Sequence, residues 1–243
     1  AGGRTTFLGA LCATGFWLGT ALTILVAVAV RSEPAIPFDR SGYTLLAQGS
    51  PNAVMKVEVY LDLACSDCAL AWPVLTRVAE VYGRRAEFLY RVFPLPYHTN
   101  SFAAAKAAKT VSHYSDGDND QIASFLTKVF HDQDQISDDA TEAMTRPDVE
   151  AILAGWATSV TGIGADDFSK GMADLDIEMQ TRNQFKYGCL HGVYGTPQVY
   201  LGGVLVDDLK GGSTFQDWQD LLEPLLGNTA SKKPNGGALT GTI

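Results

Sequence analysis

Two cysteines in the stretch Leu61–Pro73, LDLACSDCALAWP, are the residues whose spacing most directly suggests chemistry. Cys65 and Cys68 are two residues apart and follow a run that is typical of a β-strand. A Cys-x-x-Cys turn at the start of a helix brings its two sulfurs close enough to form a disulfide. The unpaired N–H groups and the dipole of a helix N-terminus also favour a thiolate on the first cysteine. Strand, cysteine pair and helix together are therefore what thiol–disulfide exchange requires.

Metal binding is the alternative use of such a pair. Zinc would need two further ligands, and the sequence contains no second Cys-x-x-Cys and no His-x-x-x-His. His98 and His191 are the histidines that could converge with Cys65 and Cys68. We expect no metal and no other cofactor. The alternative, a metal-carrier function, would depend entirely on these histidines lying close to the two cysteines.

The elements around the pair predict a β–α–β unit. Residues 54–63 alternate in hydrophobicity as a strand does, and residues 65–82 have helical spacing that stops at Gly83. Residues 86–93 return to a strand pattern. The length of the crossover favours a parallel pair of strands.

Helical patterns then dominate until a pair of short strands near the C-terminus. We expect helices over four segments: Asn100 or Ser101 to about Ser112, Ile122–Phe130, Pro147–Val160, and one longer helix from Asp166 towards Tyr187. Strands at Gln198–Leu201 and Val204–Val206 should form a hairpin around a Gly-Gly turn, followed by a helix from Thr214 to Leu226. The predicted class is α/β.

Several motifs resemble the thioredoxin superfamily. They are the cysteine pair followed by Pro73, and Gly-Thr-Pro at residues 195–197 ahead of the hairpin. The helical insertion at about residues 101–188 and the stretch FPLPYH at residues 93–98 resemble the DsbA-like branch. The resemblance covers residues 54–226 and implies a thioredoxin fold with an inserted helical subdomain. It further implies a cis peptide before Pro197, Cys65 as nucleophile, Cys68 as resolving thiol, and a substrate-facing loop containing Tyr194, Thr196 and Pro197.

Three departures from the family pattern indicate weaker redox activity. Asp67 lies between the cysteines, where a carboxylate should raise the pKa of a neighbouring thiol. Val59 stands where the family often has a buried acid, and Glu58 should face the other side of the sheet. Leu63 and Ala64 replace the aromatic residues that commonly precede the pair. Cys189 is interpreted as a buried apolar residue, with a third thiol near the active face as the alternative.

Residues 7–30 contain no charge over 24 positions, which is long enough for a transmembrane helix. A single-pass anchor over residues 1–30 is therefore predicted, with a secretory signal peptide as the alternative. The chain begins with Ala1 rather than Met, so we expect that a presequence or the initiator Met has been removed. Small residues recur every four positions and predict packing against another membrane helix, unless they reflect only the frequency of glycine in such helices: Gly15, Gly19, Thr23 and Ala27.

The remaining segments and the composition give less specific information. Residues 31–53 are rich in Pro and Gly and are interpreted as a linker. The polar tail, residues 227–243, should be disordered unless something holds it. The net charge of −9 offers no basic surface for nucleic acid.

Two functions remain in competition at this point. We favour an accessory subunit of a larger, respiratory-type membrane complex, with weak or vestigial thiol chemistry and with other transmembrane subunits as partners. The alternative is an active, membrane-tethered oxidoreductase that acts on protein thiols or disulfides. The mitochondrial inner membrane is the favoured location, with the bacterial inner membrane and the thylakoid as alternatives.

Overall fold

The computed structural model describes residues 44–227. The predicted anchor, most of the predicted linker and the C-terminal tail lie outside them, and no helix within this range is long and apolar enough to cross a membrane. The strands are β1 (Leu46–Gly49), β2 (Met55–Leu61), β3 (Ala86–Val92), β4 (Gln198–Leu201) and β5 (Val204–Val206). The helices are α1 (Ser66–Tyr82), α2 (Ser101–Tyr114), α3 (Asn119–Asp132), the 3-10 helix η2 (Gln133–Ile136), α4 (Asp138–Thr141), α5 (Arg146–Thr161), α6 (Ala165–Ala173), α7 (Leu175–Leu190) and α8 (Phe215–Gly227).

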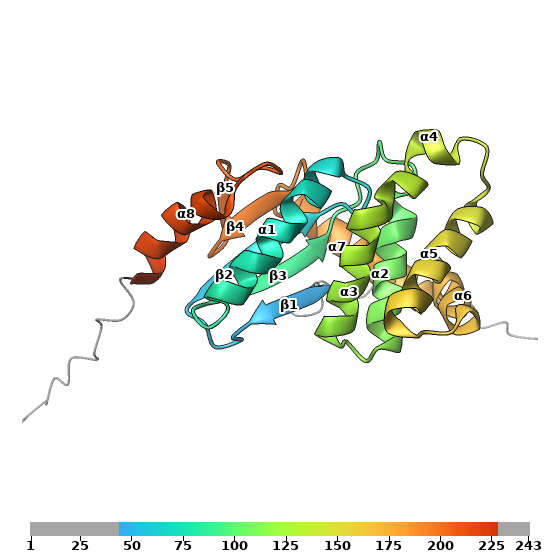
Figure 1. Ribbon diagram of the computed structural model, residues 1–243, viewed down its shortest axis with the longest axis horizontal. Helices are drawn as coiled ribbons and strands as arrows, with labels where there is room; N and C mark the ends of the chain where they lie inside the picture. The colour runs from blue at the N-terminus through green and yellow to red at the C-terminus, as the bar shows by residue number, and fades with distance from the viewer. Residues whose placement is uncertain (1–43, 228–243) are drawn as a thin grey trace, which may run out of the picture. The chain divides into compact units, whose positions relative to one another are not determined.

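The strands form one mixed sheet in the order β1-β3-β2-β4-β5 (Figure 1). β2 and β3 are parallel and are joined by α1, which confirms the predicted β–α–β unit. β4 is antiparallel to β2, and β4 and β5 form the expected hairpin. The cysteine pair therefore follows a central strand, which is the most firmly held part of such a sheet.

Alternating side chains on these strands separate the two faces of the sheet. Val57, Val59 and Leu61 of β2 belong to the main hydrophobic core on the α1 side. Tyr60, on the opposite side of the same strand, joins a smaller cluster with Tyr187 of α7. The pair is thus built on a strand that is covered on both faces.

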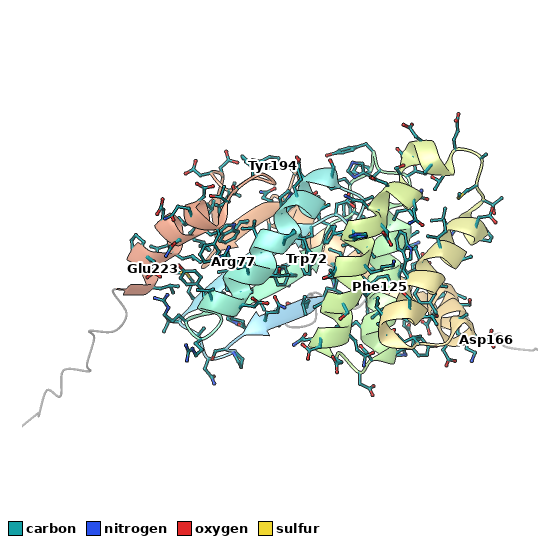
Figure 2. The ribbon with its side chains drawn as sticks, in the orientation of Figure 1. Trp72, Arg77, Phe125, Asp166, Tyr194 and Glu223 are labelled. Carbon is teal, nitrogen blue, oxygen red and sulfur yellow. The ribbon has the colours of Figure 1, made fainter. Side chains whose placement is uncertain are left out.

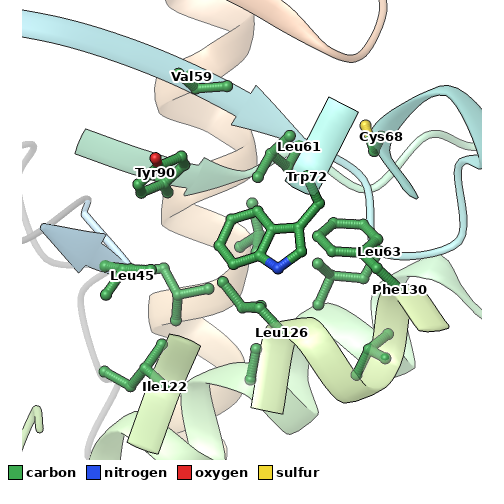
Figure 3. Close-up of a cluster of buried hydrophobic side chains, with 14 of the residues drawn as sticks. Leu45, Val59, Leu61, Leu63, Cys68, Trp72, Tyr90, Ile122, Leu126 and Phe130 are labelled. Carbon is green, nitrogen blue, oxygen red and sulfur yellow. The ribbon is translucent and has the colours of Figure 1, made fainter. Parts of the chain in front are cut away.

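Trp72 of α1 joins the sheet to the helical part of the molecule (Figures 2 and 3). Its ring packs edge-on against Tyr90 of β3 and at a tilt against Phe130 of α3, both with ring centroids 5.4 Å apart. Its indole N–H donates a hydrogen bond to Thr127 Oγ1 at 2.9 Å. Trp72, Trp156 and Trp218 are all buried, as their helical spacing predicts.

The helical insertion runs from α2 to α7 and differs from the prediction at one point. The single long helix expected from Asp166 is two helices, α6 and α7, which meet at Asp174. Asp174 has an extended backbone, and its carboxylate accepts hydrogen bonds from the backbone N–H groups of Asp176 and Ile177. Such N-terminal capping explains why a new helix begins where the hydrophobic spacing suggested continuity.

A strand also lies in the segment that we interpreted as a linker. β1 pairs antiparallel with β3, from Leu46 opposite Tyr90 to Gly49 opposite Glu87. Gly49 has a φ of +94°, and the next residue, Ser50, donates its N–H to the carbonyl oxygen of Gly83 at 2.6 Å. Glycine suits this sharp turn, and the glycine content that suggested a linker is instead what allows an edge strand to end there.

Candidate active site

The two cysteines lie at the N-terminus of α1, as predicted. Cys65 is the N-cap residue, and Cys68 is in the first turn of the helix. Both are free thiols; Cys65 is 7% exposed, whereas Cys68 is completely buried. Cys68 lies among the core side chains near Trp72, Leu61 and Leu63 (Figure 3). An attacking thiol near the surface above an inaccessible one is the arrangement that a nucleophile and a resolving thiol require.

The predicted loop around Pro197 lies directly beside Cys65. The Thr196–Pro197 peptide bond is cis, and the Cys65 thiol contacts the Thr196 carbonyl oxygen at 3.5 Å. Tyr194 is 69% exposed and lies at the end of the molecule where α1 begins (Figure 2). The loop lines a pocket of about 160 Å³ together with Asp207 and Lys210. The structure therefore brings together all five predicted site residues of the domain.

The two thiols differ in acidity. The pKa of Cys65 is lowered from 9.0 to about 6, mainly because the Cys68 thiol donates a hydrogen bond to the Cys65 sulfur. Backbone hydrogen bonds from residues 67 and 68 lower this pKa further. Burial raises the pKa of Cys68 well above its ordinary value. The expectation that Asp67 raises the pKa of its neighbour was wrong, because its side chain is exposed and its backbone N–H faces the Cys65 sulfur.

Replacing Cys68 with alanine should raise the pKa of Cys65. Wild-type Cys65 should react with iodoacetamide with a midpoint near pH 6, and Cys68→Ala should move this midpoint upward by roughly one to two pH units, since a hydrogen bond to a charged group is lost. Because the folded pKa lies below the unfolded value, ionised Cys65 stabilises the reduced protein fully above about pH 9 and loses this effect as the pH falls through about 6. The rate of alkylation, followed by mass spectrometry from pH 4 to 10, measures the midpoint. An unchanged midpoint would show that another group sets it.

Glu58 faces away from the cysteines, as predicted from strand alternation. Its carboxylate forms an ion pair with Arg91 of β3, with 3.0 Å between Oε2 and Nε, and both side chains are buried. The Arg91 guanidinium also donates a hydrogen bond to Thr44 Oγ1 and lies over the ring of Tyr187, 4.7 Å from its centroid. Val59 points into the core on the α1 side. The position where the family often has an acid is therefore apolar here.

A buried carboxylate nevertheless lies beside the pair, at a position where the sequence pattern predicted none. Asp62 is 1% exposed and follows β2 directly, three residues before Cys65. Its backbone N–H lies 3.4 Å from Cys68 Sγ, and its carboxylate contacts His98 and Ser101. The detectable signal was a charged residue at the end of a strand that is otherwise buried. His98, named above only as a histidine that could converge with the cysteines, forms part of this group through its Nδ1.

Two further residues shape the cysteine turn without carrying chemistry. The side-chain amide of Gln133 lies 3.3 Å from the carbonyl oxygens of Leu63 and Cys65 and donates to both when its nitrogen faces them. On the other side, Gly211 lies so close to Asp67 that a Cβ there would come within 2.6 Å of the Asp67 carbonyl oxygen. The turn is thus held between the start of η2 and the loop before α8.

The remaining candidates lie outside this group. Cys189 is exposed, contrary to its interpretation as a core residue, because its neighbour Gly188 occupies the buried side of α7 against Phe93. The His191 ring nitrogen Nδ1 contacts the backbone carbonyl oxygen of Tyr187 at 2.9 Å. Within residues 44–227, no three His, Cys, Asp or Glu side chains are grouped as metal ligands. The predicted packing residues Gly15, Gly19, Thr23 and Ala27 lie outside the described residues.

Comparisons with known structures agree with this geometry. The chain is similar to DsbA from Chlamydia trachomatis, with a TM-score of 0.64 and 17% identity over 83% of this chain and 100% of the other. It is also similar to BdbD from Bacillus subtilis, with a TM-score of 0.60 and 17% identity over 81% and 97%. A putative protein-disulfide isomerase from Pseudomonas syringae gives a TM-score of 0.64 and 16% identity over 73% and 97%. At these identities the likeness establishes a DsbA-like fold.

The sequence itself identifies the family. No curated protein matches the chain. A family model described as thioredoxin matches residues 41–223, which is most of the chain and includes β1 within the segment first interpreted as a linker. With this match and a DsbA-like arrangement of strands, cysteines and helical insertion, the protein belongs to the thioredoxin family.

Proposed function

We propose that this protein is a thiol–disulfide oxidoreductase that exchanges disulfides with protein substrates through Cys65 and Cys68. This reverses the order of preference drawn from the sequence. The observation that carries the proposal is the position of the Cys65 sulfur, 3.5 Å from the Thr196 carbonyl oxygen and in front of a completely buried Cys68. A pair with no role in exchange would not need one acidic, 7% exposed thiol above a completely buried one.

The reaction follows from the difference between the two thiols. The Cys65 thiolate attacks a substrate disulfide, forms a mixed disulfide and expels one substrate thiolate. The Cys68 thiolate then attacks Cys65 Sγ, forms the Cys65–Cys68 disulfide and expels the second substrate thiolate. Two electrons pass from the pair to the substrate, and the same steps in reverse oxidise a substrate dithiol.

The loop containing Tyr194, Thr196 and Pro197 supplies a surface for the substrate backbone. Its exposed Tyr194 and the adjoining pocket, which Asp207 and Lys210 also line, offer both apolar and charged contacts to residues flanking a substrate cysteine. A loop in which Tyr194 is exposed and residues 195–197 are half-buried suits extended polypeptide segments rather than one small molecule.

The reduction potential of the pair tests this proposal. It is measured on the full chain in detergent by thiol mass-tagging across defined redox buffers, with Cys12→Ser and Cys189→Ser in the background. We expect a value between about −120 and −270 mV, the range of known exchange proteins. A value below about −300 mV, or thiols that never pair, would contradict the proposal.

That contrary result would favour an accessory subunit of a membrane complex. Its support is the uncharged run at residues 7–30 with small residues at every fourth position, which we propose as a single-pass anchor that packs against other transmembrane subunits. The mitochondrial inner membrane remains the proposed location, with the bacterial inner membrane and thylakoid as alternatives. Extraction in mild detergent distinguishes the two roles. A subunit should be released as part of a large particle, whereas a free enzyme should be released by itself.

A further inference from the structure

Asp62 contacts both cysteines through its backbone. Its carbonyl oxygen accepts a hydrogen bond from Cys65 N at 3.1 Å, and its own N–H donates to Cys68 Sγ at 3.4 Å. Because Cys68 is completely buried, water does not reach its sulfur. The Asp62 N–H is a polar group of the protein that does contact this sulfur. The two peptide units that flank the Asp62 Cα atom therefore each contact one cysteine.

The Asp62 carboxylate fixes the orientation of these peptide units. Oδ1 accepts hydrogen bonds from Ala64 N at 2.9 Å and from the Ser101 hydroxyl, and Oδ2 accepts from Leu95 N at 3.0 Å. Oδ2 also lies 2.7 Å from His98 Nδ1. A buried carboxylate that faces this many donors is held in one rotamer, and its backbone is held with it.

These contacts come from two different parts of the molecule. Ala64 belongs to the cysteine loop itself, whereas Leu95, His98 and Ser101 belong to the segment from the end of β3 to the first turn of α2. The carboxylate therefore ties the end of β2 to the place where the helical insertion begins. Residue 59, the usual position of a buried acid, is a valine and cannot assist Cys68.

We propose that Asp62 is a positioning residue for the second half of thiol exchange: its carboxylate holds the Asp62 N–H on the Cys68 sulfur, which stabilises that sulfur as a thiolate. The inference rests on the proposed function and adds to it a step-specific role. When Cys68 attacks Cys65 Sγ, the thiolate must form inside the protein, and the N–H is the donor that compensates its charge. The first step, attack by Cys65 on the substrate, depends on the Cys68 thiol and on helix N–H groups instead.

The test separates the two steps in single-turnover experiments on the full chain, with Cys12→Ser and Cys189→Ser as background. The substrate is a fluorescent peptide–glutathione disulfide, and quenching with acid followed by mass spectrometry counts the mixed disulfide. Asp62→Asn should form the mixed disulfide at the wild-type rate but resolve it roughly tenfold or more slowly, as expected when a hydrogen bond to a charged group is weakened. The alkylation midpoint of Cys65 should remain near pH 6.

Asp166→Asn is the matched control, because it removes the same charge from an exposed side chain in α6, outside the candidate site. It should leave the resolution rate unchanged. Ser101→Ala and His98→Gln each remove one contact of the carboxylate and should slow resolution about two- to fivefold. They decide the question if Asp62→Asn does not fold.

The outcomes distinguish this inference from the proposed function. Wild-type protein that forms no mixed disulfide at all would overturn both. Wild-type exchange together with unchanged resolution in Asp62→Asn, or in both Ser101→Ala and His98→Gln, would overturn the role of Asp62 alone. Equal slowing of both steps, or a shifted Cys65 midpoint, would show a general distortion of the turn and would also overturn it.

Discussion

Cys65→Ser is expected to reduce the rate of disulfide exchange by at least roughly a thousandfold, because the nucleophile is lost. Cys68→Ser is expected to stop the reaction one step later. Cys65 can still attack a substrate disulfide in this variant, but no buried thiol remains to release the product. The mixed disulfide between Cys65 and the substrate should therefore accumulate. Intact-mass spectrometry of the quenched reaction should then show the variant protein with the mass of one substrate peptide added.

The control for this prediction removes the thiols outside the pair. Cys189 is exposed and could react by itself, so Cys12→Ser and Cys189→Ser should be present in every variant. With these replacements alone, exchange should proceed at the wild-type rate. Exchange that persists in Cys65→Ser only while Cys189 is present would assign the reaction to Cys189 and refute the proposed mechanism.

The second large effect concerns stability rather than activity. Glu58→Ala is expected to destabilise the protein by about 3–5 kcal/mol, because it leaves the buried Arg91 guanidinium without its carboxylate. For a domain of this size, that corresponds to a fall in Tm of roughly 10 °C or more. Differential scanning calorimetry on the reduced protein measures it.

A paired replacement tests the reason for this loss. Glu58→Gln with Arg91→Met removes both charges while keeping similar volumes, and should recover much of the stability lost in Glu58→Ala. Lys56→Ala is the matched control, because Lys56 pairs with Glu87 in the same sheet but is 55% exposed in its side chain, and its loss should cost less than about 1 kcal/mol. A Glu58→Ala variant as stable as the wild type would show that Arg91 is sufficiently held by its other contacts.

The sequence allowed the sheet and the cysteine site to be predicted because both depend on local patterns. Alternation over residues 54–63 placed Val59 and Glu58 on opposite faces, and strand, cysteine pair and helix occur within a short stretch. The loop at Pro197 was found only through the resemblance to a family. Nothing in its local sequence states that it lies 3.5 Å from a sulfur 131 positions away.

The parts that were missed depend on contacts that a linear pattern does not contain. Asp62 is one acidic residue among many until β3 and α2 bring Leu95, His98 and Ser101 to its carboxylate. The break at Asp174 depends on a capping hydrogen bond, and β1 is too short to show a period of its own. The acidity of Cys65 was misjudged because a nearby charge was considered without the hydrogen bonds that dominate it.

The two borders of the sheet are protected in different ways, and this bears on how the protein behaves when concentrated. Beside β1 lies α3, and Asn119 Oδ1 of that helix accepts a hydrogen bond from Ala47 N at 3.4 Å. β5 forms the other border, and its residue Val204 is 70% exposed. A strand of only three residues presents few backbone groups to a neighbouring chain, so the short length of β5 limits intermolecular β-pairing at this edge of the sheet. Insertions that lengthen the strands on either side of the Gly202–Gly203 turn would expose more unpaired backbone groups at this edge and would promote aggregation.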